Sequence, residues 1–559
     1  MYQPLIVVLI GVAVVVAGIL WFRLHAFLAL ILASFVVAAL TPAASLDRFF
    51  VGEAGFAVQH DSTEQSLMVT AKPGQIREHD RLMLVGLTTA EGAYADIMPV
   101  TAAHMTKDGN CLLVPDDADI LLAGHQSLRA VPFEALKSAR KSSKATLGEQ
   151  VAVGFGKACL SIGIIIAMAG IIGKCLLESG AADRIVRTTV RWFGQPAAPI
   201  AFALSGFLLG VPVFFDTVFL LLIPLGKAMR VRTGRNYLLY VMTIVCGATM
   251  AHSLVPPTPG PLTIAQELDV NLGAMILGGL VVGLGTTAFG VVFAMVVNRF
   301  TDIPLRESAD LSLAQLEEAA KRPDDALPSL GWSLTPILLP VILITADSLL
   351  ETVNTPPTWM SALVWEQLTN MVRLLGDKNV CLTLSAAIAM WVLIRQRGGR
   401  ISDLSEMIQS ALAGAGVIIL ITAAGGSLGN TLRQTGIASL VQSLPQSSPA
   451  VLCILAFVLT TTIRAAQGSA TVAMMTSAGI FSGLVQGGEL GFHPLYLALT
   501  IGCGSKPLAW MNDSGFIVVT RISGLTETEG LKYITTLMTG MGLFGLFMIL
   551  IGVSVWPNF

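Results

Sequence analysis

Long apolar segments separated by short polar ones recur along nearly the whole chain. Examples are residues 4–22, 24–41, 151–177, 273–298 and 536–556. Each is close to or above the roughly 20 residues that an α-helix needs to cross a bilayer core of about 30 Å. Because a membrane interior satisfies no backbone polar group, many such spans favour a helical bundle over a β-barrel. The pattern predicts an all-α polytopic membrane protein.

The first apolar segment lacks the basic region that begins a cleaved signal peptide. It is followed, after Arg23 and His25, by a second apolar segment. We therefore expect residues 1–44 to be retained as an N-terminal transmembrane hairpin.

Residues 45–146 interrupt the apolar pattern. They are rich in Asp, Glu, Lys, Gly and Pro and contain short alternating runs, such as RLMLVG at 81–86 and CLLV at 111–114, which predict β-strands. A segment of about 100 residues is long enough for a core of its own, so we expect a small β-rich soluble domain inserted after the second helix. Its histidines (60, 79, 104 and 125) are spaced too widely to indicate a metal site, and we expect neither metal nor cofactor.

Composition supports a membrane protein and argues against other classes. Hydrophobic residues make up 54% of the 559 residues and charged residues 13%, whereas soluble chains carry about 25% charged residues. The formal net charge of -2 and the absence of long basic tracts argue against nucleic-acid binding. The seven cysteines show no CxxC or zinc-like spacing, which favours a packing role.

A weak internal repeat divides the chain into two halves. The sequence GKCLLESG at 173–180 aligns with GNTLRQTG at 429–436. Each copy is followed by an interrupted apolar segment and then by a segment that Pro or Gly breaks. These segments are 199–229 and 237–270 in the first half, and 449–485 and 493–519 in the second. Paired, interrupted segments in two halves indicate the binding site of a secondary transporter.

Positive charges predict on which side of the membrane the two ends of the first interrupted segment lie, because Lys and Arg in short loops remain cytoplasmic. Basic residues lie at both ends of 199–229: Arg184, Arg187 and Arg191 before it, and Lys227, Arg230, Arg232 and Arg235 at or after its end. Both ends on one side imply a re-entrant hairpin of two half-helices of about 11 residues, with GVPVFFD at 210–216 as its tip. The second segment, 449–485, has few flanking basic residues and is expected to enter from the periplasm.

Counting spans outward places both termini and the inserted domain in the periplasm, with basic cytoplasmic stretches at Arg23, 299–322, 395–400 and 521–532. Four basic residues near the third span argue against a periplasmic inserted domain: Lys137, Arg140, Lys141 and Lys144. Long loops, however, translocate largely regardless of their charge.

The predicted domains are the hairpin 1–44; the insertion 45–146; transport repeat 1, 147–298, with hairpin 199–229 and broken helix 237–270; a cytoplasmic loop, 299–331; connecting helices, 332–406; and transport repeat 2, 407–559, with hairpin 449–485 and broken helix 493–519.

The few ionisable residues inside apolar segments concentrate at the predicted breaks. They are Asp216, His252, Arg464, Lys506 and Asp513. A charged residue at the centre of a membrane helix costs about 2.5–3.5 kcal/mol even on insertion scales, so each is a functional candidate.

Half-helix ends at the two hairpin tips offer N–H groups to an anion, and Arg464 adds a bidentate carboxylate partner. The segments 252–261 and 504–515 cannot stay helical through their Pro and Gly residues, which exposes carbonyls and side chains to the cavity. The candidate substrate-binding residues are Arg464, Ser469, Thr471, Thr217, Asn512 and His252. Lys506 is a possible second anion contact, and Asp216 and Asp513 are candidates for the coupling ion.

Four motifs resemble the gluconate:proton symporter family, which includes D-serine and other sugar-acid permeases within the ion-transporter superfamily. They are PVFFDTVFLLLIPL at 212–225, HSLVPPTPGPLTIA at 252–265, RAAQGSATVA at 464–473 and MNDSGF at 511–516, in the family's order and spacing. The resemblance covers about 1–45 and 147–559 and leaves out the inserted domain. It implies two inverted repeats, each with a re-entrant hairpin and an unwound helix, and proton-coupled uptake of a hydroxy-carboxylate.

The sequence departs from the commoner family pattern at four positions. Thr258 replaces a usual His, Gln467 replaces a small apolar residue and Asp216 replaces Glu. Lys506 is unexpected at its position. These changes preserve the class and leave the particular substrate open.

Alternative functions remain at this stage. The unwound backbone with Ser469, Thr471 and Asn512 would also suit sodium, so a sodium-coupled carboxylate transporter is one alternative. A ligand sensor built on a transporter scaffold is another, since the inserted domain is atypical. No HExxH, GxSxG or P-loop motif supports an enzyme. We expect a multi-pass protein of the cell inner membrane that binds a small organic acid and protons. A homodimer is a possible assembly of this protein.

Overall fold

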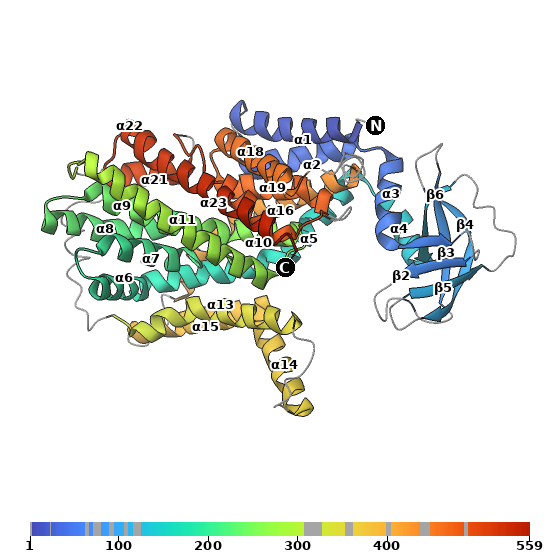
Figure 1. Ribbon diagram of the computed structural model, residues 1–559, viewed down its shortest axis with the longest axis horizontal. Coiled ribbons are helices and arrows are strands. Elements are labelled where there is room, and N and C mark those ends of the chain that lie inside the picture. Colours follow the sequence, from blue (N-terminus) through green and yellow to red (C-terminus); the bar gives the residue numbers. More distant parts are fainter. Residues whose placement is uncertain are drawn as a thin grey trace.

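The computed structural model describes most of the chain as a helical bundle joined to a small β-barrel (Figure 1). The described residues are 3–22, 24–61, 66–70, 76, 80–88, 94–105, 110–115, 125–306, 327–352, 361–397, 404–436, 448–485, 490–511 and 513–558.

Seven helical segments of the described chain are long and apolar enough to cross a membrane. Five are single helices: α5 (Leu147–Glu178), α11 (Leu272–Phe300), α13 (Leu330–Thr352), α15 (Lys378–Gln396) and α16 (Leu404–Gln434). Two are composite: α9 (Tyr237–Leu254) with α10 (Pro259–Glu267), and α22 (Glu527–Glu529) with the π-helix η2 (Gly530–Thr535) and α23 (Thr536–Val555). The prediction of a polytopic helical membrane protein is confirmed.

The N-terminal segment forms the predicted helical pair. Helices α1 (Gln3–Leu20) and α2 (Ala26–Leu40) pack against each other, and α2 packs on α16. Their apolar residues share a cluster with α16 that includes Leu30, Val37 and Leu428. After a bend of 100°, the chain continues from α2 into α3 (Ala43–Ala54), which leads to the barrel.

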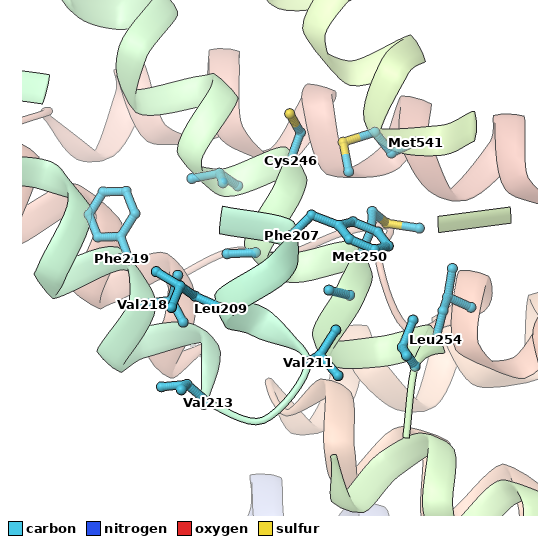
Figure 2. Close-up of a cluster of buried hydrophobic side chains, with 14 of the residues drawn as sticks. Phe207, Leu209, Val211, Val213, Val218, Phe219, Cys246, Met250, Leu254 and Met541 are labelled. Atoms are coloured by element: carbon cyan, nitrogen blue, oxygen red, sulfur yellow. The ribbon is translucent and has the colours of Figure 1, made fainter. Parts of the chain in front are cut away.

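Helix α9 lies at the centre of the bundle. All its residues are buried except His252, as expected for a helix that is apolar on all sides. It packs closely on α7 (Ala198–Gly210) because Gly247 has no side chain: a Cβ there would lie 1.9 Å from the carbonyl oxygen of Ala203. Figure 2 shows the apolar side chains around this contact, including Phe207 and Met250.

Two helical hairpins occupy the predicted positions. The first joins α7 to α8 (Phe215–Thr233), and the second joins α18 (Pro449–Gln467) to α19 (Ala470–Val485) through Gly468, whose φ of 72° favours glycine. The half-helix length of about 11 residues expected for the first hairpin is wrong for α8, which contains 19 residues, whereas α7 contains 13. In α8 the extra length carries the basic residues Lys227 and Arg230 beyond the apolar part.

Two further segments are broken at the positions where Pro and Gly predict it. Residues 255–258 separate α9 from α10, since Pro256 and Pro257 lack the N–H that a continuous helix requires. Residues 505–513 separate α20 (Pro494–Gly504) from α21 (Ser514–Ser523), and Leu508 adopts a positive φ of 56° within this break. These breaks free backbone carbonyls near the hairpin tips.

The inserted segment forms a closed antiparallel barrel, which confirms the prediction of a β-rich domain. Its strand order in the described chain is β1-β2-β5-β4-β3-β6, with β6 pairing back to β1. The strands are β1 (Phe56–Asp61), β2 (Ser66–Thr70), β3 (Arg81–Thr88), β4 (Tyr94–Met105), β5 (Asn110–Pro115) and β6 (His125–Pro132). Its own core includes Leu82, Leu84 and Val100, and α3 and α4 (Phe133–Ser143) lie between the barrel and the bundle (Figure 1).

Two shorter helices complete the described chain. Helix α6 (Ala181–Phe193) follows α5 and carries Arg184, Arg187 and Arg191. Helix α14 (Ala362–Gly376) links α13 to α15 and extends away from the bundle (Figure 1).

Candidate functional site

A cavity of about 350 Å³ lies where the two hairpin tips meet the end of α9 and the break after α20. It is lined by Phe214, Phe215, Asp216, Thr217, Thr249, His252, Ile418, Arg464, Ser469, Ala470, Thr471, Lys506, Asp513, Gly515, Phe516, Val519, Ile534 and Met538. Segments more than 250 residues apart in sequence therefore build one site.

Eight of the nine predicted site residues line this cavity. They are Asp216, Thr217, His252, Arg464, Ser469, Thr471, Lys506 and Asp513. The ninth, Asn512, lies outside the described residues. Helix α8 begins at Phe215 and α19 at Ala470, so Asp216, Thr217 and Thr471 occupy first turns, where backbone N–H groups favour an anion.

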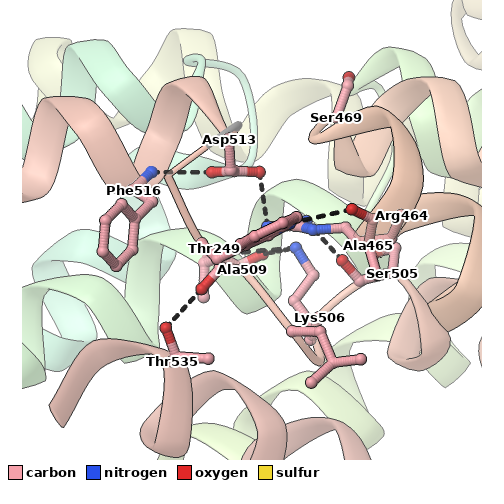
Figure 3. Close-up of polar contacts among 12 residues, drawn as sticks. Thr249, Arg464, Ala465, Ser469, Ser505, Lys506, Ala509, Asp513, Phe516 and Thr535 are labelled. Atoms are coloured by element: carbon pink, nitrogen blue, oxygen red, sulfur yellow. Dashed lines mark hydrogen bonds and ion pairs between the residues drawn. The ribbon is translucent and has the colours of Figure 1, made fainter. Parts of the chain in front are cut away.

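Arg464 and Asp513 form a buried ion pair (Figure 3). Arg464 Nη2 lies 2.7 Å from Asp513 Oδ2, and the two side chains are 2% and 8% exposed. Arg464 Nη1 also donates to the carbonyl oxygen of Ser505, and Asp513 Oδ1 accepts from the Phe516 backbone N–H at 2.7 Å. The pair therefore joins the end of α18 to the break before α21.

Lys506 supplies a second buried cation. Its side chain is 1% exposed, and Nζ donates to Thr249 Oγ1 at 3.2 Å and to the Thr249 carbonyl oxygen at 3.3 Å. No carboxylate of the described residues lies within 4 Å of this ammonium. Both of its hydrogen-bond partners are neutral oxygens, so its charge is not neutralised by a direct ion pair.

Asp216 and His252 are the cavity's other titratable groups. Asp216 has no hydrogen-bond or ion-pair partner in the described part of the chain. His252 Nδ1 is buried without a partner there, and its ring packs edge-on against Phe214 with centroids 6.0 Å apart. Both side chains are therefore available to a ligand in the cavity.

Sequence reasoning missed some of the lining. Thr249 lies three residues before His252 and thus on the same side of α9, a spacing that would have revealed it. Phe214, Phe215 and Phe516 form apolar walls, and no polar signal distinguishes them from core residues. Clusters of three or more His, Cys, Asp or Glu able to hold a metal are absent from the residues the structure covers.

Spanning helices around a cavity lined by polar and charged residues, with two hairpins and two broken segments, form a multi-pass membrane protein of the transporter class. The model of the GntP family permease matches residues 142–555, and the chain belongs to this family. The match begins after the barrel, so residues 1–141, including the first hairpin, lie outside it.

Several relatives share most of this matched region. The chain is 32% identical over 402 residues to a gluconate permease of Pseudomonas aeruginosa, covering 71% of this chain and 86% of the relative. It is 28% identical to the low-affinity gluconate transporter of Escherichia coli (70% and 85% covered) and 28% identical to that organism's Gnt-II system L-idonate transporter (71% and 87% covered).

Two solved transporter structures share the fold. The YdaH transporter of Alcanivorax borkumensis aligns with a TM-score of 0.52 at 17% identity, covering 79% of this chain and 94% of that chain. MtrF of Neisseria gonorrhoeae, described as one of a class of antimetabolite efflux pumps, aligns with a TM-score of 0.54 at 14% identity, covering 97% of each chain. At these identities the similarity extends to the fold alone.

Proposed function

We propose that this chain is a secondary active transporter that imports a small hydroxy-carboxylate, such as gluconate, a related sugar acid or D-serine, together with protons. Relatives named for gluconate and L-idonate transport support this substrate class. The four motifs that resemble the gluconate:proton symporter family lie at the cavity or at the helix breaks beside it.

The observation that carries the proposal is the cavity itself. Two buried cations, Arg464 and Lys506, line this cavity among apolar helices. Its volume of about 350 Å³ falls within the usual range of small-molecule sites. Buried positive charge in a membrane protein is costly unless it serves an anion, which favours a carboxylate substrate.

The remaining polar groups suit the hydroxyls of a sugar acid. Thr217, Ser469 and Thr471 can donate and accept hydrogen bonds, and His252 has a buried nitrogen without a partner among the described residues. They form the proposed substrate-binding set. The sequence adds Arg464 and Asn512 to this set, and in the structure Arg464 is paired with Asp513.

Alternating access would come from two inverted repeats, residues 147–298 and 407–559, each with one hairpin and one broken segment. Basic residues at the ends of the α7–α8 hairpin support a cytoplasmic entry, and their scarcity around the α18–α19 hairpin supports the opposite side. By the same reasoning the protein lies in the inner membrane with its barrel in the periplasm.

Asp216 and Asp513 are the proposed coupling residues, because a carboxylate can carry a proton while arginine stays charged. Both line the same cavity as the proposed substrate site. A proton bound to either carboxylate would therefore change the electrostatic environment of the bound substrate.

Uptake of labelled gluconate into proteoliposomes tests the function. A pH gradient, inside alkaline, should drive accumulation, and a sodium gradient at equal pH should not. A vesicle without protein and one with the Lys506→Met variant serve as controls. Binding of dicarboxylates without binding of sugar acids would overturn the substrate class, and accumulation driven by sodium alone would overturn the coupling ion.

A further inference from the structure

The charged groups of the cavity sum to zero. Two carboxylates, Asp216 and Asp513, face two cations, Arg464 and Lys506. His252 from α9 is the other titratable group in the described lining, and α7 and α19 contribute none. A substrate anion entering this cavity alone would leave a net charge of minus one inside the membrane, where an uncompensated charge is costly.

One of the two charge pairs is already satisfied. Asp513 binds Arg464 at 2.7 Å and also accepts the Phe516 N–H, while Arg464 donates to the carbonyl of Ser505. The Nε of Arg464 has no hydrogen-bond partner among the described residues, but Asp513 already balances the charge of this guanidinium. A substrate carboxylate bound there would place a second negative charge beside Asp513, which is unfavourable.

Lys506 and Asp216 are the cation and the anion of the cavity that form no ion pair with another described residue. Lys506 uses two of its three N–H donors on Thr249, and it has no carboxylate within 4 Å among the described residues. Asp216 has no hydrogen-bond or ion-pair partner in the same set. Asp216 and Lys506 line the same cavity, so their charges add to those of Arg464 and Asp513 there.

We propose that the substrate carboxylate binds Lys506 while Asp216 takes up one proton, so that the total charge of the cavity stays at zero. This inference rests on the proposed transport of a carboxylate. One O–H bond of a hydronium ion breaks and one O–H bond forms on an Asp216 oxygen, which leaves a water molecule, and no bond of the substrate changes. The loaded cavity is again neutral, so each cycle moves one proton with each anion.

Proton uptake on binding is the direct test. Gluconate is added to the purified full-length protein in weakly buffered solution with a pH indicator, and binding is measured in parallel by calorimetry. The wild type should take up one proton per gluconate bound at a pH where Asp216 starts ionised. Asp216→Asn should still bind gluconate but take up no proton, and Glu366→Gln, which changes an exposed carboxylate on α14, should behave like the wild type.

Transport gives a second readout. The wild-type cycle carries no net charge, so a potassium diffusion potential should not change its uptake at a fixed pH gradient. Asp216→Asn should still exchange internal for external gluconate, but it should lose accumulation driven by a pH gradient. A negative interior should slow its net uptake, because each cycle of the variant then moves one negative charge inward.

Lys506→Met should weaken gluconate binding about tenfold or more, since it removes a charged partner. If the unbalanced Asp216 prevents this variant from folding, Asp216→Asn with Lys506→Met restores a neutral cavity and should fold without binding gluconate. Melting temperatures in detergent identify folded variants.

Distinct outcomes separate this inference from the proposed function. If the wild type binds no sugar acid, the proposed function fails. If it binds gluconate without proton uptake, or if Asp216→Asn takes up a proton as the wild type does, the inference alone is wrong. Unchanged binding by folded Lys506→Met also overturns it.

Discussion

Arg464 is the largest of the fully buried side chains in the described chain, and its position depends on three segments. It leaves α18, binds Asp513 before α21 and donates to Ser505 after α20. A buried ion pair adds little net stability compared with apolar packing, but removing one partner costs about 3–5 kcal/mol. We therefore infer that the main role of this ion pair is to fix the shape of the cavity.

Arg464→Lys should weaken gluconate binding about tenfold, although the charge is kept. A single ammonium cannot reproduce the planar guanidinium that serves Asp513 and Ser505 together. Equilibrium binding to the purified protein measures the effect. The matched control is Arg433→Lys, because Arg433 lies at the end of α16 and pairs with Glu53 outside the cavity. Equal affinities of the two variants would contradict the role given to Arg464.

Gly247→Ala should destabilise the bundle by about 1–3 kcal/mol, as overpacking does in other proteins. The new Cβ would lie 1.9 Å from the Ala203 carbonyl, so α7 and α9 would have to separate. Thermal unfolding in detergent measures the loss. Gly163→Ala in α5 is the control, since a Cβ there meets no atom within 4 Å and alanine favours a helix. A Gly247→Ala variant as stable as this control would refute the steric argument.

Hairpins and broken segments are the elements that build the cavity. Helices α8 and α19 begin beside it, the last turn of α9 supplies His252, and the break after α20 supplies Lys506. Because non-helical backbone inside a membrane must be covered by protein or line a polar cavity, these elements can meet only in the middle of the bundle.

Single cysteines test the entry sides. Labelling by a membrane-impermeant thiol reagent should place 227–235 and 395–400 in the cytoplasm and 486–494 in the periplasm, as the distribution of Lys and Arg indicates. Native cysteines should give a low background because five of the six that the structure describes are buried. The inverted-repeat proposal is wrong if 486–494 labels from the same side as 227–235.

At the scale of the whole molecule, the barrel and the transport bundle have separate cores. The barrel's apolar residues cluster with one another, and the cavity is lined by residues from 214 onward. The two parts are joined through α3 and α4, and Arg433 of α16 binds Glu53 of α3 at 2.8 Å. Glu53 is 49% exposed, so this pair contributes little to stability.

Replacing 45–146 by a short Gly/Ser linker should therefore preserve gluconate uptake in proteoliposomes. Full-length Glu53→Gln is the control that removes the ion pair while retaining the barrel. If the truncated protein reaches the membrane in folded form and transports nothing, the barrel is required for transport, and the sensor alternative gains support.

Much of the bundle and of the site could be predicted from sequence, because membrane physics leaves few choices. Apolar length determines a span, Pro and Gly determine a break, and a charge inside a span must serve a function or find a partner. The same local signals identified eight cavity residues and the β-rich insertion. Barrel closure was not predictable, because the pairing of β6 with β1 joins strands about 70 residues apart.

Only the tertiary structure decided which charges are paired. From sequence, Arg464 is the natural carboxylate anchor and Asp513 one of two candidate proton carriers. In the fold these two residues bind each other, whereas Lys506 and Asp216 have no ion-pair partner among the described residues. The contact between Lys506 and Thr249 joins residues 257 positions apart. No local pattern specifies such a contact, because it depends on how independently formed helices pack, and that packing sets the distances on which ion pairing depends.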